Sequence, residues 1–116
     1  PILLKNWHEK PEEVIMPEGE SIKDVSVRSI EAFNKICLSQ QNNDLTLVVA
    51  HDAVNKTLIC NILGMNHSNI WMIKQGNGGI TVIDLFNDPS KSPVISALNI
   101  TTHLGGIIDS TASGAL

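Results

Sequence analysis

Residues 45–56 read LTLVVAHDAVNK, an apolar run that ends at a histidine and continues directly into a helical pattern. The run from Leu45 to Ala50 is uncharged and rich in β-branched residues, which predicts a strand buried on both faces of a sheet. In an open α/β sheet, ligands bind beyond the carboxyl end of such a strand, close to the first amides of the next helix. His51 therefore stands where chemistry is expected.

Apolar residues at helical spacing predict one helix on each side of this strand. The first runs from about Ser21 to Ser39, and Ser21 with Asp24 forms a weak capping box at its start. The second runs from about Ala53 to Leu63, and Gly64 ends it. Its predicted inward stripe consists of Val54, Leu58, Ile59, Ile62 and Leu63. A strand followed at once by a helix is half of a doubly wound α/β unit.

The two ends of the chain have less regular patterns. Prolines interrupt residues 1–17, which we expect to be loop with at most one helical turn. Further on, Ile80 to Phe86 alternates as a strand, residues 87–90 form a turn, and Val94 to Ile100 is the expected hairpin partner. The tail 105–116 is small and polar, and we expect it to be flexible.

The composition narrows the class of protein. The 116 residues are 42% apolar and 17% charged, with a net charge of −4, which is typical of a soluble globular domain. This charge gives no general attraction for nucleic acid or acidic membranes, and no apolar run approaches the ~20 residues that span a bilayer. Cys37 and Cys60 lie in helical patterns, which favours buried thiols in the reducing cytoplasm over a disulfide.

Each candidate side chain has a functional and a structural interpretation. His51 is a general acid/base or a cation facing phosphate, or else a hydrogen-bonded histidine at a strand end. Lys56 lies one helical turn after Asp52 and either directs its charge into the same site or is an ordinary solvated lysine. Arg28 is a snorkelling side chain or an anion clamp. Metal binding is weakly supported, because the histidines are scattered and neither cysteine has a close second ligand.

Two groups of residues together resemble the histidine phosphatase superfamily, the phosphoglycerate mutase-like enzymes. Pro17-Glu18-Gly19-Glu20-Ser21, with Arg28 after it, is similar to the family's Pro-x-Gly-Glu-Ser helix start and following Arg. Residues 48–56 are similar to its Val-Val-x-His-x-x-Val-x-Arg strand–helix unit. The match continues through Asn77-Gly78-Gly79 and residues 99–104, so it covers most of residues 17–104. Members that look similar include α-ribazole phosphatase and 2-carboxyarabinitol 1-phosphatase.

The resemblance implies hydrolysis of a phosphomonoester through a phosphohistidine intermediate, with no metal or other cofactor. His51 matches the second histidine, which supports the transferring phosphoryl group, and Lys56 matches the basic residue that reaches the substrate. Asn77 and Gly78 match the loop that lines the pocket. The implied substrate is a small sugar- or sugar-acid-type phosphate. Asp52 stands where the family commonly has an uncharged residue, and we hypothesise that it hydrogen-bonds a sugar-type hydroxyl.

Two catalytic parts of the family are absent from the sequence. No Arg-His-Gly tripeptide, which holds the nucleophile, occurs in the chain, and the family's general-acid Glu is also missing. Glu20 belongs to a helix start instead. We therefore expect residues 1–104 to be the C-terminal portion of a histidine phosphatase-like domain that is inactive alone.

The expected fold is α/β, part of a three-layer α/β/α sandwich with a mostly parallel sheet and a C-terminal hairpin. The expected partners are a small phosphorylated metabolite and either a missing N-terminal segment of the same domain or a second copy of the chain. One alternative is a non-catalytic phosphatase-fold domain for binding or assembly. Another is an unrelated α/β domain in which His51 is structural.

Overall fold

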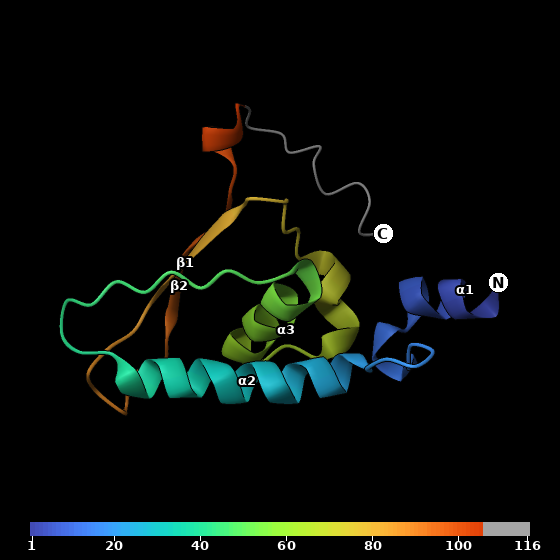
Figure 1. The fold of residues 1–116 in the computed structure, drawn as a ribbon, viewed down its shortest axis with the longest axis horizontal. Helices are drawn as coiled ribbons and strands as arrows, with labels where there is room; N and C mark the ends of the chain where they lie inside the picture. The colour runs from blue at the N-terminus through green and yellow to red at the C-terminus, as the bar shows by residue number, and fades with distance from the viewer. Residues whose placement is uncertain (106–116) are drawn as a thin grey trace. The chain divides into compact units, whose positions relative to one another are not determined.

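The computed structural model describes residues 1–105, which form two compact units (Figure 1). The first unit is Pro1–Ile73, and the second begins at Lys74. The first holds three α-helices and two short 3₁₀ helices: α1 (Ile2–Glu9), η1 (Pro11–Glu13), α2 (Ile22–Ser39), α3 (Asp52–Leu63) and η2 (His67–Met72). The second holds strands β1 (Ile80–Asp84) and β2 (Val94–Ile100) and the 3₁₀ helix η3 (Thr102–Leu104).

The α/β class is confirmed, since helices and a sheet both occur, but the sheet of the described residues has two strands and is antiparallel. The three-layer sandwich and the mostly parallel sheet stay predictions. Of the expected flexible tail, only Gly105 lies within the described residues. That expectation and the domain boundary at residue 104 are therefore untested.

Helix α2 begins at the capping box that the sequence predicts. Ser21 Oγ accepts a hydrogen bond from the Asp24 amide at 3.1 Å, and Asp24 Oδ2 accepts one from the Ser21 amide at 3.0 Å. These bonds satisfy two backbone donors that a helix start otherwise leaves unpaired. The helix continues to Ser39, so its predicted span is confirmed.

Helix α3 packs beside α2 (Figure 1) and ends where Gly64 adopts a left-handed φ of 66°. Glycine takes this conformation without the strain that a side chain would add. Ile59 and Cys60 of α3 are buried in a core that other segments complete with Val14, Ile22, Ile70 and Ile73. The predicted inward stripe is right for Ile59 but wrong for Leu63, which is exposed. Lys56 and Thr57 are buried in its place, because α2 and η2 cover that side of the helix.

The largest departure concerns residues 45–50, the predicted buried strand. They form no strand, and their apolar side chains face solvent: Leu45 is 98% exposed and Val49 is 86% exposed. Figure 1 draws them as a plain trace that joins α2 to α3. A strand requires backbone hydrogen bonds from a neighbouring strand, and no strand of the described residues pairs with this segment. The prediction of a buried strand is therefore wrong for this structure.

The opening of the chain also differs from its prediction, because Ile2–Glu9 is a helix of eight residues rather than loop. Pro1 precedes this helix and Pro11 follows it, so the prolines bound the helix instead of interrupting it. Trp7 anchors it, since its ring meets Trp71 edge to face with centroids 5.2 Å apart.

The predicted hairpin is confirmed. Strands β1 and β2 pair antiparallel, with Ile83 opposite Ile95 and Asp84 opposite Val94. The predicted turn is confirmed as well: Asp88 Oδ1 accepts from the Ser90 amide at 2.9 Å, and its carbonyl accepts from the Lys91 amide at 3.0 Å. Such side-chain bonds to the backbone two residues on are what favour Asp in turns.

Candidate active site

His51 is the N-cap residue of α3. Its backbone is extended, with φ −110° and ψ 166°, and its carbonyl accepts the first helical bond, from the Asn55 amide at 2.9 Å. Its imidazole makes no capping hydrogen bond and the residue is exposed. The sequence thus places an uncommitted histidine side chain beside the partial positive charge of a helix start.

Asp52 and Lys56 lie on the same side of α3, one turn apart. Lys56 Nζ is 3.2 Å from Asp52 Oδ2, and the Lys56 side chain is only 6% exposed. The ammonium also lies 4.9 Å from the centroid of the Trp71 ring, which is a cation–π distance. Lys56 is therefore a buried, paired cation and not the solvated lysine that its spacing alone allowed. Its approach to a substrate stays a prediction.

Asn77 and Gly78 lie in a tight loop of the second unit. Gly78 has a φ of 75°, and its carbonyl is 2.7 Å from His103 Nε2. Asn77 is exposed. The structure thus brings His51, Asp52 and Lys56 together at the start of α3 and places Asn77 and Gly78 in the other unit. A single site that contains both groups stays a prediction.

Sequence reasoning missed the residues that shape this loop. Asn99 has a left-handed φ of 51°, and its Oδ1 accepts from the Gly76 amide at 2.8 Å. Thr81 Oγ1 accepts from Gln75 Nε2 at 3.0 Å and from the Asn99 amide at 3.2 Å. A Cβ at Gly79 would lie 2.5 Å from Asn99 Oδ1, so a larger residue there would displace the Asn99 side chain. The available signal was an asparagine at a strand end, because Asn tolerates this backbone better than most residues.

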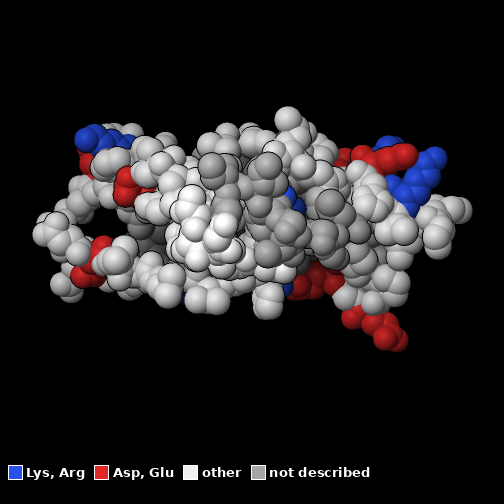
Figure 2. Space-filling view, turned by 90° about the horizontal axis from the view of Figure 1, so that it is seen from above, with Lys and Arg blue, Asp and Glu red and all other residues white. Residues whose placement is uncertain are grey.

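On the face that Figure 2 shows, the charged side chains of the described residues do not gather into one basic region. Figure 2 shows acidic and basic side chains in separate small groups on one face, with no broad basic patch among the described residues drawn there.

Within residues 1–105, no three His, Cys, Asp or Glu side chains are placed to hold a metal ion. Nor is any helix in that range long and apolar enough to cross a membrane. Both cysteines are free thiols, and burial raises the pKa of each.

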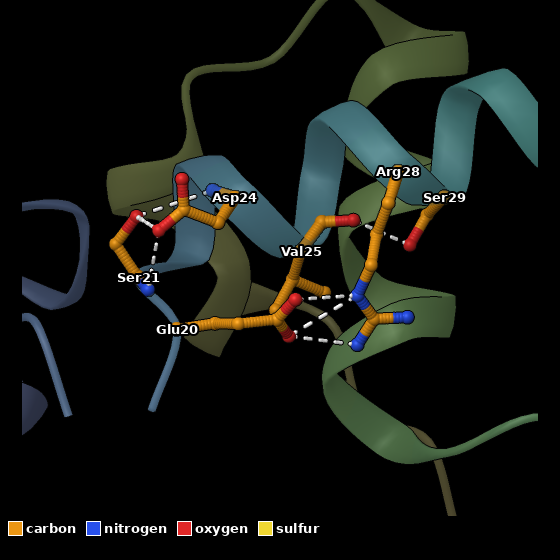
Figure 3. A network of polar contacts seen from close by, with 6 residues as sticks. All are labelled: Glu20, Ser21, Asp24, Val25, Arg28 and Ser29. Atoms are coloured by element: carbon orange, nitrogen blue, oxygen red, sulfur yellow. Dashed lines mark hydrogen bonds and ion pairs between the residues drawn. The ribbon is translucent and has the colours of Figure 1, made fainter. Parts of the chain in front are cut away.

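Arg28, the candidate anion clamp, forms an ion pair with a carboxylate of its own chain. Figure 3 shows its guanidinium facing Glu20, with Nε 2.8 Å from Oε1 and Nη2 2.8 Å from Oε2. The hydrogen bond from Arg28 lowers the pKa of the Glu20 carboxyl, and the same bond raises the pKa of Arg28. Both side chains are largely exposed, so this pair contributes little to stability. Its position just before the capping box supports the expected role of Glu20 at a helix start.

Comparisons with known proteins agree on one family. A model of the histidine phosphatase superfamily (branch 1) matches residues 1–101. Phosphoserine phosphatase 1 of Hydrogenobacter thermophilus is 31% identical over 102 residues, which cover 88% of this chain and 46% of that protein. The 2-carboxy-D-arabinitol-1-phosphatase of Triticum aestivum is 26% identical over 97 residues, which cover 84% of this chain and 19% of that protein.

A solved structure has the same fold. A mutant of phosphoserine phosphatase from Entamoeba histolytica, in complex with phosphoserine, superposes with a TM-score of 0.70 at 28% identity. The match covers 89% of this chain and 51% of that one. This chain therefore spans about half the length of the Hydrogenobacter and Entamoeba relatives.

Proposed function

The chain belongs to the histidine phosphatase superfamily, and from that premise we propose that it is the C-terminal portion of a metal-independent phosphomonoesterase. The proposed reaction is hydrolysis through a phosphohistidine intermediate, and the proposed substrate is a small sugar- or sugar-acid-type phosphate. The observation that carries the proposal is the exposed His51 imidazole, uncommitted to capping, at the start of α3 and within the matched residues.

In this proposal His51 supports the equatorial oxygens of the transferring phosphoryl group. Phosphoryl transfer needs mainly positioning and charge stabilisation from a protein, and an imidazole beside a helix start provides both. Lys56, one turn further along α3, is the basic residue that reaches the substrate in this scheme. Asn77 and Gly78 line the pocket through the loop braced by Asn99. The reaction needs no metal in this scheme.

The nucleophilic histidine and the general acid come from another segment in this proposal. Two observations support a preceding segment of the same domain as that partner. Residues 45–49 are exposed and no strand of the described residues pairs with them, and two of the relatives are about twice as long as this chain. A strand of that segment beside residues 45–50 would build the mostly parallel sheet of a three-layer sandwich. A second copy of the chain is the other proposed partner. The free thiols of Cys37 and Cys60 support the cytoplasm as the compartment.

The test compares this chain with the product of its complete coding sequence, using p-nitrophenyl phosphate and a panel of sugar phosphates. We expect activity in the complete protein, none in residues 1–116 alone, and a loss of about 10²–10³-fold in His51→Ala. His8→Ala is the matched control, because His8 is another exposed histidine of the first unit. Inactivity of the complete protein would favour a binding or assembly role. Full activity of His51→Ala would overturn the role of this histidine.

A further inference from the structure

The starting point is the buried ion pair on α3. A buried ammonium must be compensated, and Asp52 Oδ2, 3.2 Å from Lys56 Nζ, supplies the opposite charge. The pair as a whole carries no net charge. One oxygen of the Asp52 carboxylate is thereby fixed, and its orientation is set by Lys56.

Aromatic side chains hold the cation of this pair in place. The Trp71 ring lies 4.9 Å from Lys56 Nζ, and Trp71 Nε1 donates to the Trp7 carbonyl at 2.9 Å. The edge-to-face contact of the two tryptophans adds a second restraint on the Trp71 ring. Trp71 is therefore placed to act on Asp52 through Lys56.

The second oxygen of Asp52 is unexplained by the fold. Among the described residues, Asp52 Oδ1 is a buried acceptor without any hydrogen-bond partner. Native proteins rarely leave a buried carboxylate oxygen unsatisfied, since the lost hydration is costly. The Asp52 side chain as a whole is 24% exposed although this oxygen is itself buried, and Asp52 follows His51 at the start of α3. The start of α3, which is the proposed phosphate site, thus holds an acceptor that lacks a donor.

We propose that Asp52 is a specificity-determining residue whose free carboxylate oxygen accepts a hydrogen bond from a hydroxyl group of the phosphomonoester substrate. This inference rests on the proposed function. A hydroxyl fits better than an ammonium group, because the charge of Asp52 is already offset by Lys56 and a second cation would be repelled by that ammonium. Trp71 is a positioning residue in this arrangement.

The experiment measures kcat/KM of the complete protein for three phosphomonoesters with three-carbon skeletons. Glycerol 1-phosphate carries hydroxyl donors, propyl phosphate carries no alcohol hydroxyl, and 3-aminopropyl phosphate carries an ammonium group. We expect the wild type to prefer glycerol 1-phosphate over both others by about 10- to 100-fold, the range for one hydrogen bond to a charged group. Asp52→Leu should remove this preference, because kcat/KM should fall about 10- to 100-fold more for glycerol 1-phosphate than for propyl phosphate.

Further variants separate recognition from folding. Asp52→Asn keeps an acceptor oxygen and should retain part of the preference. Trp71→Phe keeps a ring face over Lys56 and should retain more of it than Trp71→Leu. Glu31→Leu is the matched control, because Glu31 forms a similar i,i+4 pair with Lys35, at 3.0 Å, on the exposed face of α2. It should leave the hydroxyl preference unchanged.

Several outcomes would overturn the inference. The wild-type ratios test it even if Asp52→Leu does not fold: equal rates on glycerol 1-phosphate and propyl phosphate, or a preference for 3-aminopropyl phosphate, would exclude a hydroxyl acceptor. An equal loss on glycerol 1-phosphate and propyl phosphate in folded Asp52→Leu would assign Asp52 a purely structural role. Hydrolysis of none of the three esters or of p-nitrophenyl phosphate would overturn the proposed function, and this inference with it.

Discussion

Residues 45–50 and the hairpin of β1 and β2 are both rich in β-branched residues, yet they differ in where a hydrogen-bonding partner is found. Strand β1 finds its partner a few residues along the chain, through the Asp88 turn. Residues 45–50 lie between two helices, and no strand of the described residues lies beside them. An apolar, β-branched run therefore indicates that a segment can form a strand. Whether it does so depends on whether another strand is available to pair with it.

The most direct test of this difference between the two segments is amide hydrogen exchange on residues 1–116. Amides of residues 45–50 should exchange about 10- to 100-fold faster than those of Val94–Ile100, because only the latter are in a ladder. In the product of the complete coding sequence, residues 45–50 should become as protected as the hairpin. Protection of residues 45–50 in the short chain would show that they already have a partner there.

The same contrast between covered and uncovered apolar groups exists within α3. Ile59→Ala should lower the free energy of unfolding by about 2–5 kcal/mol, because Ile59 is enclosed in the core of the first unit. Leu63→Ala should cost less than about 0.5 kcal/mol in residues 1–116, since Leu63 faces solvent. Urea denaturation measures both. Similar costs for the two variants would mean that Leu63 is covered in solution.

The hairpin also depends on the side chain of Asn99. Asn99→Ala should lower the free energy of unfolding by about 2 kcal/mol. The variant loses the hydrogen bond to the Gly76 amide, and alanine tolerates the left-handed backbone at this position less well than asparagine. Asn99→Gly loses only the bond and should cost about 1 kcal/mol. Thermal unfolding separates the two contributions. Equal costs would show that the backbone conformation is not a source of strain.

A modest effect is expected at the α2 cap, which needs no distant partner. Ser21→Ala should cost about 1 kcal/mol at neutral pH. Hydrogen bonds from Ser21 hold the pKa of the Asp24 carboxyl below its ordinary value of 3.8. The stabilisation from that carboxylate is therefore fully present above pH 3.8 and is lost as the pH falls through the lowered pKa. The difference between wild type and Ser21→Ala should shrink in that acid range, as circular dichroism melts would measure.

These contrasts explain which features could be predicted from the sequence. The α2 cap and the end of α3 are local: Ser21 and Asp24 are three residues apart, and Gly64 alone supplies its backbone conformation. The turn at Asp88 is local in the same way. Each of these signals lies within a few neighbouring residues, so the structure predicted from the sequence pattern agrees with the observed one.

The features that were missed depend on residues far apart in the sequence. Asn99 braces Gly76 across 23 positions, and burial of Lys56 requires the Trp71 ring. The spacing of apolar residues on α3 identified Ile59 as a core residue but not Lys56. Such spacing treats every lysine as exposed, whereas the ion pair with Asp52 allows the Lys56 ammonium to be buried. His51 and the superfamily were identified from motifs, and the roles of the site residues remain predictions.

The exposed run LTLVVA has a further consequence for how the chain behaves at high concentration. Its six residues contain no charge and no proline, which is the composition that lets identical segments stack into cross-β fibrils. Asp44 directly precedes the run, and stacking copies in register would bring its like charges together. Resistance to such stacking should therefore fall when Asp44 is replaced by an uncharged residue.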